Sequence, residues 1–226
     1  MSLTPHAFWQ GLDAPGTHET APGTVFRAGY PATLPDGRHL LLPIRDLPDG
    51  SGRAVASLIV NQAAFAVEDA LADVMAEQWR DVSPEVVVGV PTLGLPLANA
   101  VARRLGHRRM VPLGTSRKFW YTDTLSEPIS SITSPGKGKT IYLDPRMLPV
   151  LEGRRVLLVD DVVSTGTSLA AVLRLLEKAG IVPAGIAVAM EQGTAWRGVL
   201  PDAALVRGAI RSPILRKAPE GYLAIP

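Results

Sequence analysis

The chain has 226 residues, of which 46% are hydrophobic and 19% are charged, enough for one large α/β domain with a well-filled core. The formal charge of +2 is a small Lys/Arg excess that gives no reason to expect a nucleic acid partner, and the lack of cysteine excludes disulfides, thiolate metal ligands and Cys nucleophiles. No apolar run approaches membrane-spanning length and no secretory signal pattern starts the chain, so we expect a cytoplasmic protein without membrane contact.

The first part of the chain predicts an irregular arm followed by a hairpin. Residues 1–24 are rich in Pro, Gly, Thr and His, which favours irregular structure. Val25–Tyr30 and His39–Ile44 each have the composition of a strand, and Leu34–Gly37 carries turn residues between them. We therefore treat residues 1–58 as an arm and a hairpin.

Residues 59–113 alternate between helical and strand patterns. Apolar side chains recur at steps of three and four from Ile59 to Trp79, which predicts an amphipathic helix. Val86–Val88 reads as a buried strand, and a second helix should run to Gly106 before a short strand at Arg109–Leu113.

The stretch from Gly114 to Asp144 shows no periodic pattern. A loop of this length in a compact domain is usually functional or disordered. Arg117 and Lys118 stand at its start, and Lys137 and Lys139 lie further along it. The simplest interpretation of Lys137 and Lys139 is a pair of solvated loop charges.

Residues 156–168 carry the clearest chemical pattern. Val156–Val159 predicts a strand buried on both faces, and Asp160 and Asp161 follow at its carboxyl end, where open α/β sheets bind ligands. A turn of small and hydroxyl residues then opens a helix, so that backbone amides and hydroxyls can surround a phosphate: Ser164, Thr165, Gly166, Thr167 and Ser168. The two carboxylates suit sugar hydroxyls or a metal ion.

The remaining residues complete an alternating pattern. Ala184–Met190 predicts another buried strand, and residues 201–226 read as short strands and loops. The alternation of strands and helices from Glu85 to Met190 predicts a parallel central sheet with helices on both faces, so the fold class is α/β.

The run VLLVDDVVSTGTS at residues 156–168 resembles the phosphoribosyl-pyrophosphate (PRPP) binding motif of the type I phosphoribosyltransferases. The resemblance implies a three-layer fold with a small hood, a PRPP-binding core at residues 59–200 and a mobile loop at about 114–144. Hood contributions would come from residues 1–58 or from the tail at 201–226. Two alternatives stay open: an ordinary capped strand–turn–helix, and a receiver-like acidic metal pocket, against which the Thr-Gly-Thr-Ser turn argues.

A second loop follows the strand at Val86–Val88. Taken alone, a Gly-rich connection from strand to helix is equally well explained as a plain tight turn. In this position it resembles the family's pyrophosphate-binding loop, and Gly89–Ala98 is most similar to the orotate branch, although Leu93 stands where that branch usually has Lys. The resemblance assigns the leaving pyrophosphate to Val90, Pro91, Thr92, Leu93 and Gly94.

The same resemblance implies transfer of ribose 5-phosphate from PRPP to a nucleobase with release of pyrophosphate, by a homodimeric enzyme of nucleotide salvage. Asp160 and Asp161 would hold the ribose hydroxyls, directly or through Mg²⁺, and the turn at 164–168 would hold the 5-phosphate. Arg117 and Lys118 resemble the Arg-Lys pair of the adenine and orotate branches and would act as catalytic groups that complete the leaving-group site. Glu191 is a candidate general base only by its position after a strand.

The identity of the base is the least constrained prediction. The loop at Arg117–Lys118 with Tyr121–Leu125 is similar to that of adenine-type enzymes, which favours a purine, and orotate is the alternative within the same chemistry. Trp120, Tyr121 or Trp196 could stack on a base, although each side chain is more often simply packed. A non-catalytic regulator that senses PRPP is the alternative from another class.

Overall fold

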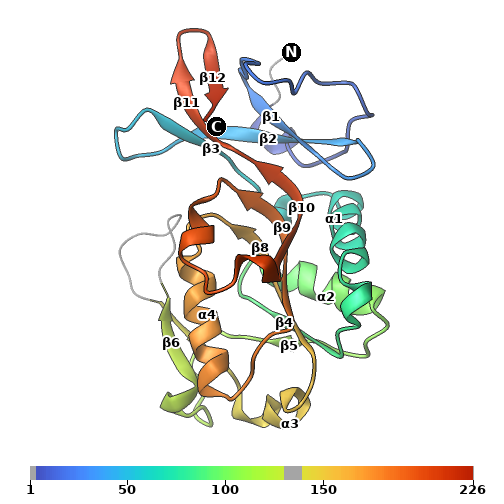
Figure 1. Ribbon diagram of the computed structural model, residues 1–226, viewed down its shortest axis with the longest axis vertical. Coiled ribbons are helices and arrows are strands. Elements are labelled where there is room, and N and C mark those ends of the chain that lie inside the picture. Colours follow the sequence, from blue (N-terminus) through green and yellow to red (C-terminus); the bar gives the residue numbers. More distant parts are fainter. Residues whose placement is uncertain (1–3, 130–138, 226) are drawn as a thin grey trace.

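A parallel five-stranded sheet forms the centre of the computed structural model, which describes residues 4–129 and 139–225 (Figure 1). The strand order is β10-β9-β8-β4-β5, and every pairing is parallel. The strands are β4 (Val86–Gly89), β5 (Val111–Pro112), β8 (Val156–Val163), β9 (Gly185–Gln192) and β10 (Val206–Ser212).

Helices cover both faces of this sheet, as the alternating pattern predicts. Along β8, Leu157 and Val159 face the cluster that contains α1 (Phe65–Glu77) and α2 (Gly94–Arg104). Val156 and Leu158 face the opposite cluster, which contains α4 (Thr167–Lys178). A short helix, α3 (Leu148–Leu151), lies at the end of the core opposite the antiparallel five-stranded sheet described next (Figure 1). The predicted α/β fold class, with a parallel central sheet and helices on both faces, is therefore confirmed.

An antiparallel sheet, which we call the hood sheet, lies across one end of the core (Figure 1). Its order is β1-β2-β3-β11-β12, so it joins strands from both ends of the described chain. These strands are β1 (Gly29–Thr33), β2 (His39–Asp46), β3 (Arg53–Ala56), β11 (Ile214–Ala218) and β12 (Gly221–Ala224). The expected hairpin forms, but β1 begins at Gly29 because Phe26 pairs with Tyr222 instead, through backbone bonds of 2.8 and 2.7 Å.

The first long helix also begins later than its apolar pattern predicts. Val60–Gln62 forms a single 3-10 turn, and α1 starts at Phe65. The N-terminal arm accounts for this boundary, because the Ala64 amide donates to the Trp9 carbonyl oxygen at 3.0 Å and the Trp9 side chain is buried. The other 3-10 turns are Pro5–Ala7, Arg80–Val82, Asp123–Leu125, Pro145–Met147, Ala195–Gly198 and Ala203–Leu205.

The stretch expected to be irregular contains a small hairpin. β6 (Ser126–Ile129) pairs with β7 (Lys139–Tyr142) and packs against α4, where Lys178 contacts the buried Glu127 at 3.0 Å. Lys139 is the first residue of β7, whereas Lys137 lies outside the described residues. In residues 4–129 and 139–225, the helices are all too short or too polar to cross a membrane.

Candidate active site

The turn between β8 and α4 has the geometry of a phosphate site. Gly166 has φ of +82°, and a β-carbon there would lie 3.2 Å from the Trp196 α-carbon, so both conformation and space require glycine. The Thr165 and Thr167 hydroxyl oxygens lie 3.1 Å apart, and α4 begins at Thr167. The helix is twelve residues long, and its amino end directs the positive end of the helix dipole into this turn.

Asp160 and Asp161 lie inside β8 rather than after it, because β9 continues to pair as far as Val163 with Glu191. The Asp160 side chain is buried, and its Oδ1 accepts the Asp161 amide at 2.9 Å. Burial, reinforced by the neighbouring charge of Asp161, raises the pKa of Asp160 well above its ordinary range. Burial also raises the pKa of Asp161. Two adjacent carboxyl groups with raised pKa values are typical of a functional site.

The loop after β4 meets this acid pair. The Pro91–Thr92 peptide is cis, and the Val90 amide donates to the Val159 carbonyl oxygen at 2.9 Å. A β-carbon on Gly94 would lie 2.8 Å from the Asp160 α-carbon, so the start of α2 touches the acid strand directly. Leu93 is partly exposed, and Thr92 is exposed at the loop surface. The loop, the acids and the phosphate turn thus converge at the carboxyl edge of the sheet.

The acid pair suits a hard cation that keeps most of its ligands from water and substrate. Within the described ranges, the structure has no group of three or more His, Asp or Glu side chains arranged to hold a metal. Mg²⁺ needs no such cage, since one or two carboxylates with substrate phosphates are its usual setting. Asp160 and Asp161 are therefore the residues that would hold Mg²⁺ at this site.

Arg117 and Lys118 lie on the exposed segment after β5. The Arg117 guanidinium pairs with Asp123 at 3.0 Å, and the Lys118 ammonium has no side-chain partner in residues 4–129 and 139–225. The structure gives neither side chain a hydrogen bond or ion pair with the acid pair. Either side chain can therefore move without breaking a buried contact.

An aromatic cluster anchors the same segment. The Trp120 indole donates to Asp144 at 3.3 Å, and the Arg146 guanidinium lies 4.4 Å from the centre of the Trp120 ring. Hydrogen bonds from Arg146 lower the pKa of Asp144 to about 2. The Tyr121 ring lies 6.0 Å from the Trp120 ring and 5.9 Å from the Tyr142 ring, so Trp120 and Tyr121 each contact neighbouring aromatic side chains.

Trp196 and Glu191, two candidate residues from the sequence, make buried contacts beside the site. Trp196 is fully buried behind Gly166 and supports the phosphate turn from the inside. Glu191 is also buried, accepts the Gly208 amide at 3.0 Å, and contacts Arg197 and Arg211 at 3.3 and 3.4 Å. Its oxygens are thus engaged with structural partners. No local spacing in the sequence signals either contact.

The junction between core and hood sheet carries two orphaned hydroxyls. Ser57 Oγ and Ser212 Oγ are buried without a hydrogen-bond partner among the described residues. Extending the pairing of β3 with β11 by two residues places Ser57 opposite Ser212. Gln192 lies in the same junction, where its amide donates to the Ala56 carbonyl oxygen at 2.7 Å. Buried hydroxyls without partners are costly unless a ligand or water satisfies them.

Three comparisons place these features among known proteins. The phosphoribosyl transferase domain model matches residues 58–204. A hypoxanthine/guanine phosphoribosyltransferase from Methanosalsum zhilinae is 34% identical over 116 residues, which cover 51% of this chain and 56% of that protein. An orotate phosphoribosyltransferase from Xylella fastidiosa is 34% identical over 109 residues, which cover 48% of this chain and 42% of that protein.

The match to a solved structure covers more of this chain than the sequence matches do. The adenine phosphoribosyltransferase from Giardia lamblia, complexed with 9-deazaadenine, superposes with a TM-score of 0.61 at 28% identity, covering 76% of this chain and 93% of that one. Against the two curated relatives, by contrast, the matched stretch spans only about half of each protein, at 56% and 42%.

Proposed function

Because this chain belongs to the type I phosphoribosyltransferase family, whose domain it matches over residues 58–204, we propose that it transfers ribose 5-phosphate from PRPP to a nucleobase and releases pyrophosphate. The observation that carries this proposal is the convergence of three segments at one sheet edge. Gly94 of the loop after β4 touches Asp160, and Asp160 lies four residues before the phosphate turn. We assign the PRPP-binding core to residues 59–200.

The phosphate turn would bind the 5-phosphate of PRPP. Backbone amides at the start of α4, with the side chains of Ser164, Thr165, Thr167 and Ser168, supply donors around an anion. The positive φ and lack of side chain at Gly166 let the backbone approach the phosphate closely. Trp196 keeps this turn fixed, because it fills the space directly behind Gly166.

Asp160 and Asp161 would hold the ribose hydroxyls. Positive charge develops on the ribose ring as the bond from C1 to the leaving oxygen breaks, so two carboxylates on this side stabilise the transition state more than the ground state. When bound to these carboxylates, Mg²⁺ supplies Lewis-acid neutralisation of the leaving pyrophosphate. Desolvation of both acids in the free protein favours binding of a cationic or hydroxyl partner there.

The leaving pyrophosphate would rest on the loop Val90–Gly94, where Thr92 is exposed. Arg117 and Lys118 would complete this site by moving onto the pyrophosphate. Arg117 must first leave Asp123, which costs little because both side chains are exposed, at 55% and 78%. Closure of residues 114–144 over PRPP would also exclude water, which otherwise hydrolyses the activated sugar.

The base would bind between the core and the hood sheet. Strands from residues 1–58 and from 201–226 both build this sheet, so both segments contribute to the hood. The orphaned hydroxyls of Ser57 and Ser212 are candidate donors or acceptors for the edge of a base. We favour a purine, because a hypoxanthine/guanine enzyme and an adenine enzyme are among the similar proteins.

Orotate remains the second candidate, supported by the similarity to the Xylella fastidiosa enzyme. Leu93 provides no positive charge in the loop, which weakens this alternative. A PRPP-sensing regulator would retain the phosphate turn without transferring the sugar. From the family resemblance we further propose a cytoplasmic homodimer in nucleotide salvage, without nucleic-acid or membrane partners.

The test is release of pyrophosphate from PRPP and Mg²⁺ with adenine, guanine, hypoxanthine, xanthine, orotate or uracil. Release with one base, together with the matching nucleotide by mass spectrometry, would establish both the activity and the specificity. Binding of PRPP without release for any base would replace the enzyme with the sensor. Failure to bind PRPP would reject both.

A further inference from the structure

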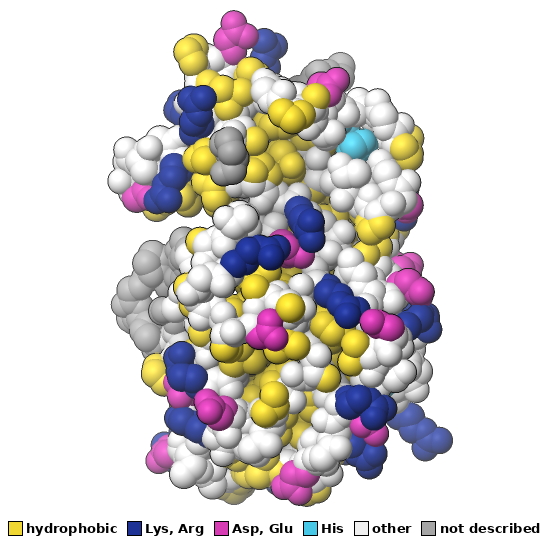
Figure 2. Space-filling model, in the orientation of Figure 1, with side chains coloured by type: hydrophobic (Ala, Val, Ile, Leu, Met, Phe, Trp, Pro, Cys, Tyr) yellow, Lys and Arg dark blue, Asp and Glu magenta, His cyan; other side chains and the backbone are white. Residues whose placement is uncertain are grey.

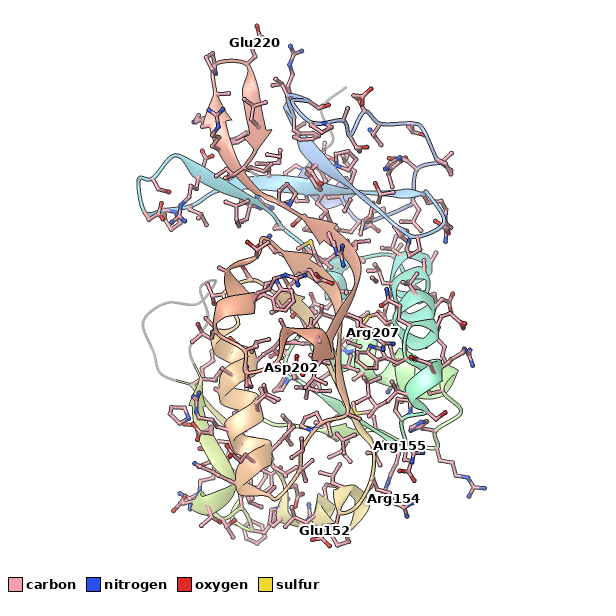
Figure 3. All side chains as sticks on the ribbon, viewed as in Figure 1. Glu152, Arg154, Arg155, Asp202, Arg207 and Glu220 are labelled. Carbon is pink, nitrogen blue, oxygen red and sulfur yellow. The ribbon has the colours of Figure 1, made fainter. Side chains whose placement is uncertain are left out.

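A basic pocket lies at the amino end of the central sheet, away from Asp160 and Asp161. Its volume is about 530 Å³, and Glu85, His107, Arg108, Arg109, Val150 and Arg154 are among its lining residues. Val86, the first residue of β4, also lines it, whereas the carboxyl end of β4 leads to the candidate active site. Figure 3 shows Arg154 beside α3, at the end of the core opposite the hood sheet.

The pocket has more positive charge than its own carboxylate can balance. Glu85 is the one acidic lining residue, and Arg154 at 3.2 Å and the Arg155 amide at 3.0 Å already bind it. Arg108 and Arg109 have no carboxylate partner anywhere in the described part of the chain, although most other arginines there do. Figure 2 shows Lys/Arg and Asp/Glu side chains interspersed along this end of the surface.

The end of α2 does not account for these cations. Cations favour helix carboxyl ends, but Arg103 and Arg104 already occupy the last turn, and Arg104 donates to the Ala100 carbonyl oxygen. The amides of Gly106 and His107 cap the final carbonyls, at 3.0 and 2.9 Å. Arg108 and Arg109 come after this completed cap and are exposed, so their guanidinium groups are available to a ligand.

The chemistry of the pocket selects a phosphate-bearing ligand. Guanidinium groups bind phosphates through paired hydrogen bonds, and two adjacent unpaired arginines suit a chain of phosphates better than one isolated anion. The volume of about 530 Å³ lies in the range of small-molecule sites. Pro149 and Val150 form an apolar wall on which a flat ring could rest.

We propose that this pocket binds a small polyphosphate ligand of nucleotide size, at a site separate from the candidate active site. A nucleoside triphosphate and an inorganic polyphosphate share the chemistry that Arg108 and Arg109 would recognise. They differ in whether a base contacts Pro149 and Val150. The proposal does not depend on the proposed transferase activity, since none of its residues belongs to that site.

The test is hydrogen exchange of the full chain with increasing ATP or tripolyphosphate. We expect saturable protection at residues 83–86, 105–110 and 149–155. Any protection at residues 90–95 and 163–169 reports the candidate active site and is read separately. In the double variant Arg108→Ala with Arg109→Ala, the affinity measured from protection at residues 83–86, 105–110 and 149–155 should fall about tenfold or more. Protection at residues 90–95 and 163–169 should not change.

The matched control is Arg45→Ala with Arg216→Ala. These two exposed arginines of the hood sheet also lack a carboxylate partner in the described ranges, so the control removes the same charge elsewhere. Protection by both probes assigns the site to the phosphates, and protection by ATP alone adds a contact to the base. The proposal would be overturned if neither ATP nor tripolyphosphate gave saturable protection at concentrations below about 1 mM. It would also be overturned if both double variants lost the same affinity. If the double variant does not fold, Arg108→Glu alone provides the same comparison.

Discussion

Gly94, at the start of α2, packs against Asp160 in β8 so closely that a β-carbon on Gly94 would lie 2.8 Å from the Asp160 α-carbon and 2.9 Å from its Oδ1. The first residue of α2 therefore packs directly against the acid strand. Any displacement of α2 moves the loop at Val90–Gly94 relative to the carboxylates.

This contact predicts the effect of Gly94→Ala. The added methyl group meets backbone atoms, which cannot rotate away, so we expect a loss of about 1–3 kcal/mol in the free energy of unfolding and weaker PRPP binding. Gly11→Ala is the control, because nothing lies within 4 Å of a β-carbon there. Denaturant unfolding and PRPP titration measure both effects. A Gly94→Ala protein that matches the Gly11→Ala protein would show that α2 can shift freely.

Removing the acid pair should abolish most turnover. We expect Asp160→Asn with Asp161→Asn to lower kcat by about 100-fold or more, because the developing positive charge on the ribose loses its stabilising carboxylates. The fold should remain, since Asn has nearly the same shape as Asp. Steady-state kinetics with PRPP, alongside circular dichroism, makes the comparison. Rates near those of the wild type would rule out the proposed ribose site.

Stability should respond to pH with a sign set by the burial of Asp160. The folded-state pKa of Asp160 is raised above its ordinary value of 3.8, so the folded protein holds more protons and loses stability as pH rises through the interval above 3.8. Asp160→Asn lacks this titration. We expect it to match the wild type below about pH 4 and to be more stable than the wild type at neutral pH.

Asp49→Asn should change the pH dependence of stability in the opposite direction to Asp160→Asn. Hydrogen bonds from Ser51 and Arg53 lower the pKa of Asp49 to about 2, so its contribution is present above pH 4 and is lost as pH falls through that lowered value. Urea unfolding across the pH range measures both variants. A stability gap for Asp160→Asn that shrinks with rising pH would contradict the account of Asp160.

Releasing Arg117 should improve substrate binding. Asp123→Asn removes the partner at 3.0 Å and leaves the guanidinium free to reach pyrophosphate. An exposed pair contributes at most about 1 kcal/mol, so we expect KM for PRPP to fall by no more than about fivefold. Asp36→Asn, which breaks the similar exposed pair with Arg38, is the control. A KM that is unchanged or higher would place Arg117 outside the substrate site.

The variant Glu191→Gln tests whether Glu191 has a structural role or acts as a general base. Glu191 is buried and contacts two exposed arginines, so we expect a loss of about 1–2 kcal/mol in unfolding free energy with the pH–rate profile unchanged in shape. Thermal unfolding and kcat/KM across pH give the two readings. Disappearance of the acidic limb of that profile would instead make Glu191 the base.

The local parts of this fold were predictable, and the long-range parts were not. The strand, acids and turn of residues 156–168 are contiguous, so hydrophobic pattern and turn chemistry suffice to predict them. The continuation of β8 through Asp160 and Asp161 depends on pairing with β9, which overrides the poor strand preference of Asp. The contact of Trp196 with Gly166 joins residues thirty positions apart, and no periodicity reports it.

The hood sheet was only partly predictable for the same reason. Turn residues between β1 and β2 predict their hairpin, but nothing in either sequence indicates that β3 pairs with β11. β6 and β7 were hidden because each is four residues long and β6 contains Pro128. Their assignment depends on packing against α4 rather than on local preference.

The pairing of β3 with β11 has a consequence for the order in which the protein folds. During synthesis, β1, β2 and β3 emerge long before β11, and the edge of β3 stays unpaired until the central sheet has been made. Contacts between such distant segments form slowly because a long loop must close first. We therefore expect the core to assemble before the hood sheet, which would make a nascent chain able to bind phosphate before it can enclose a base.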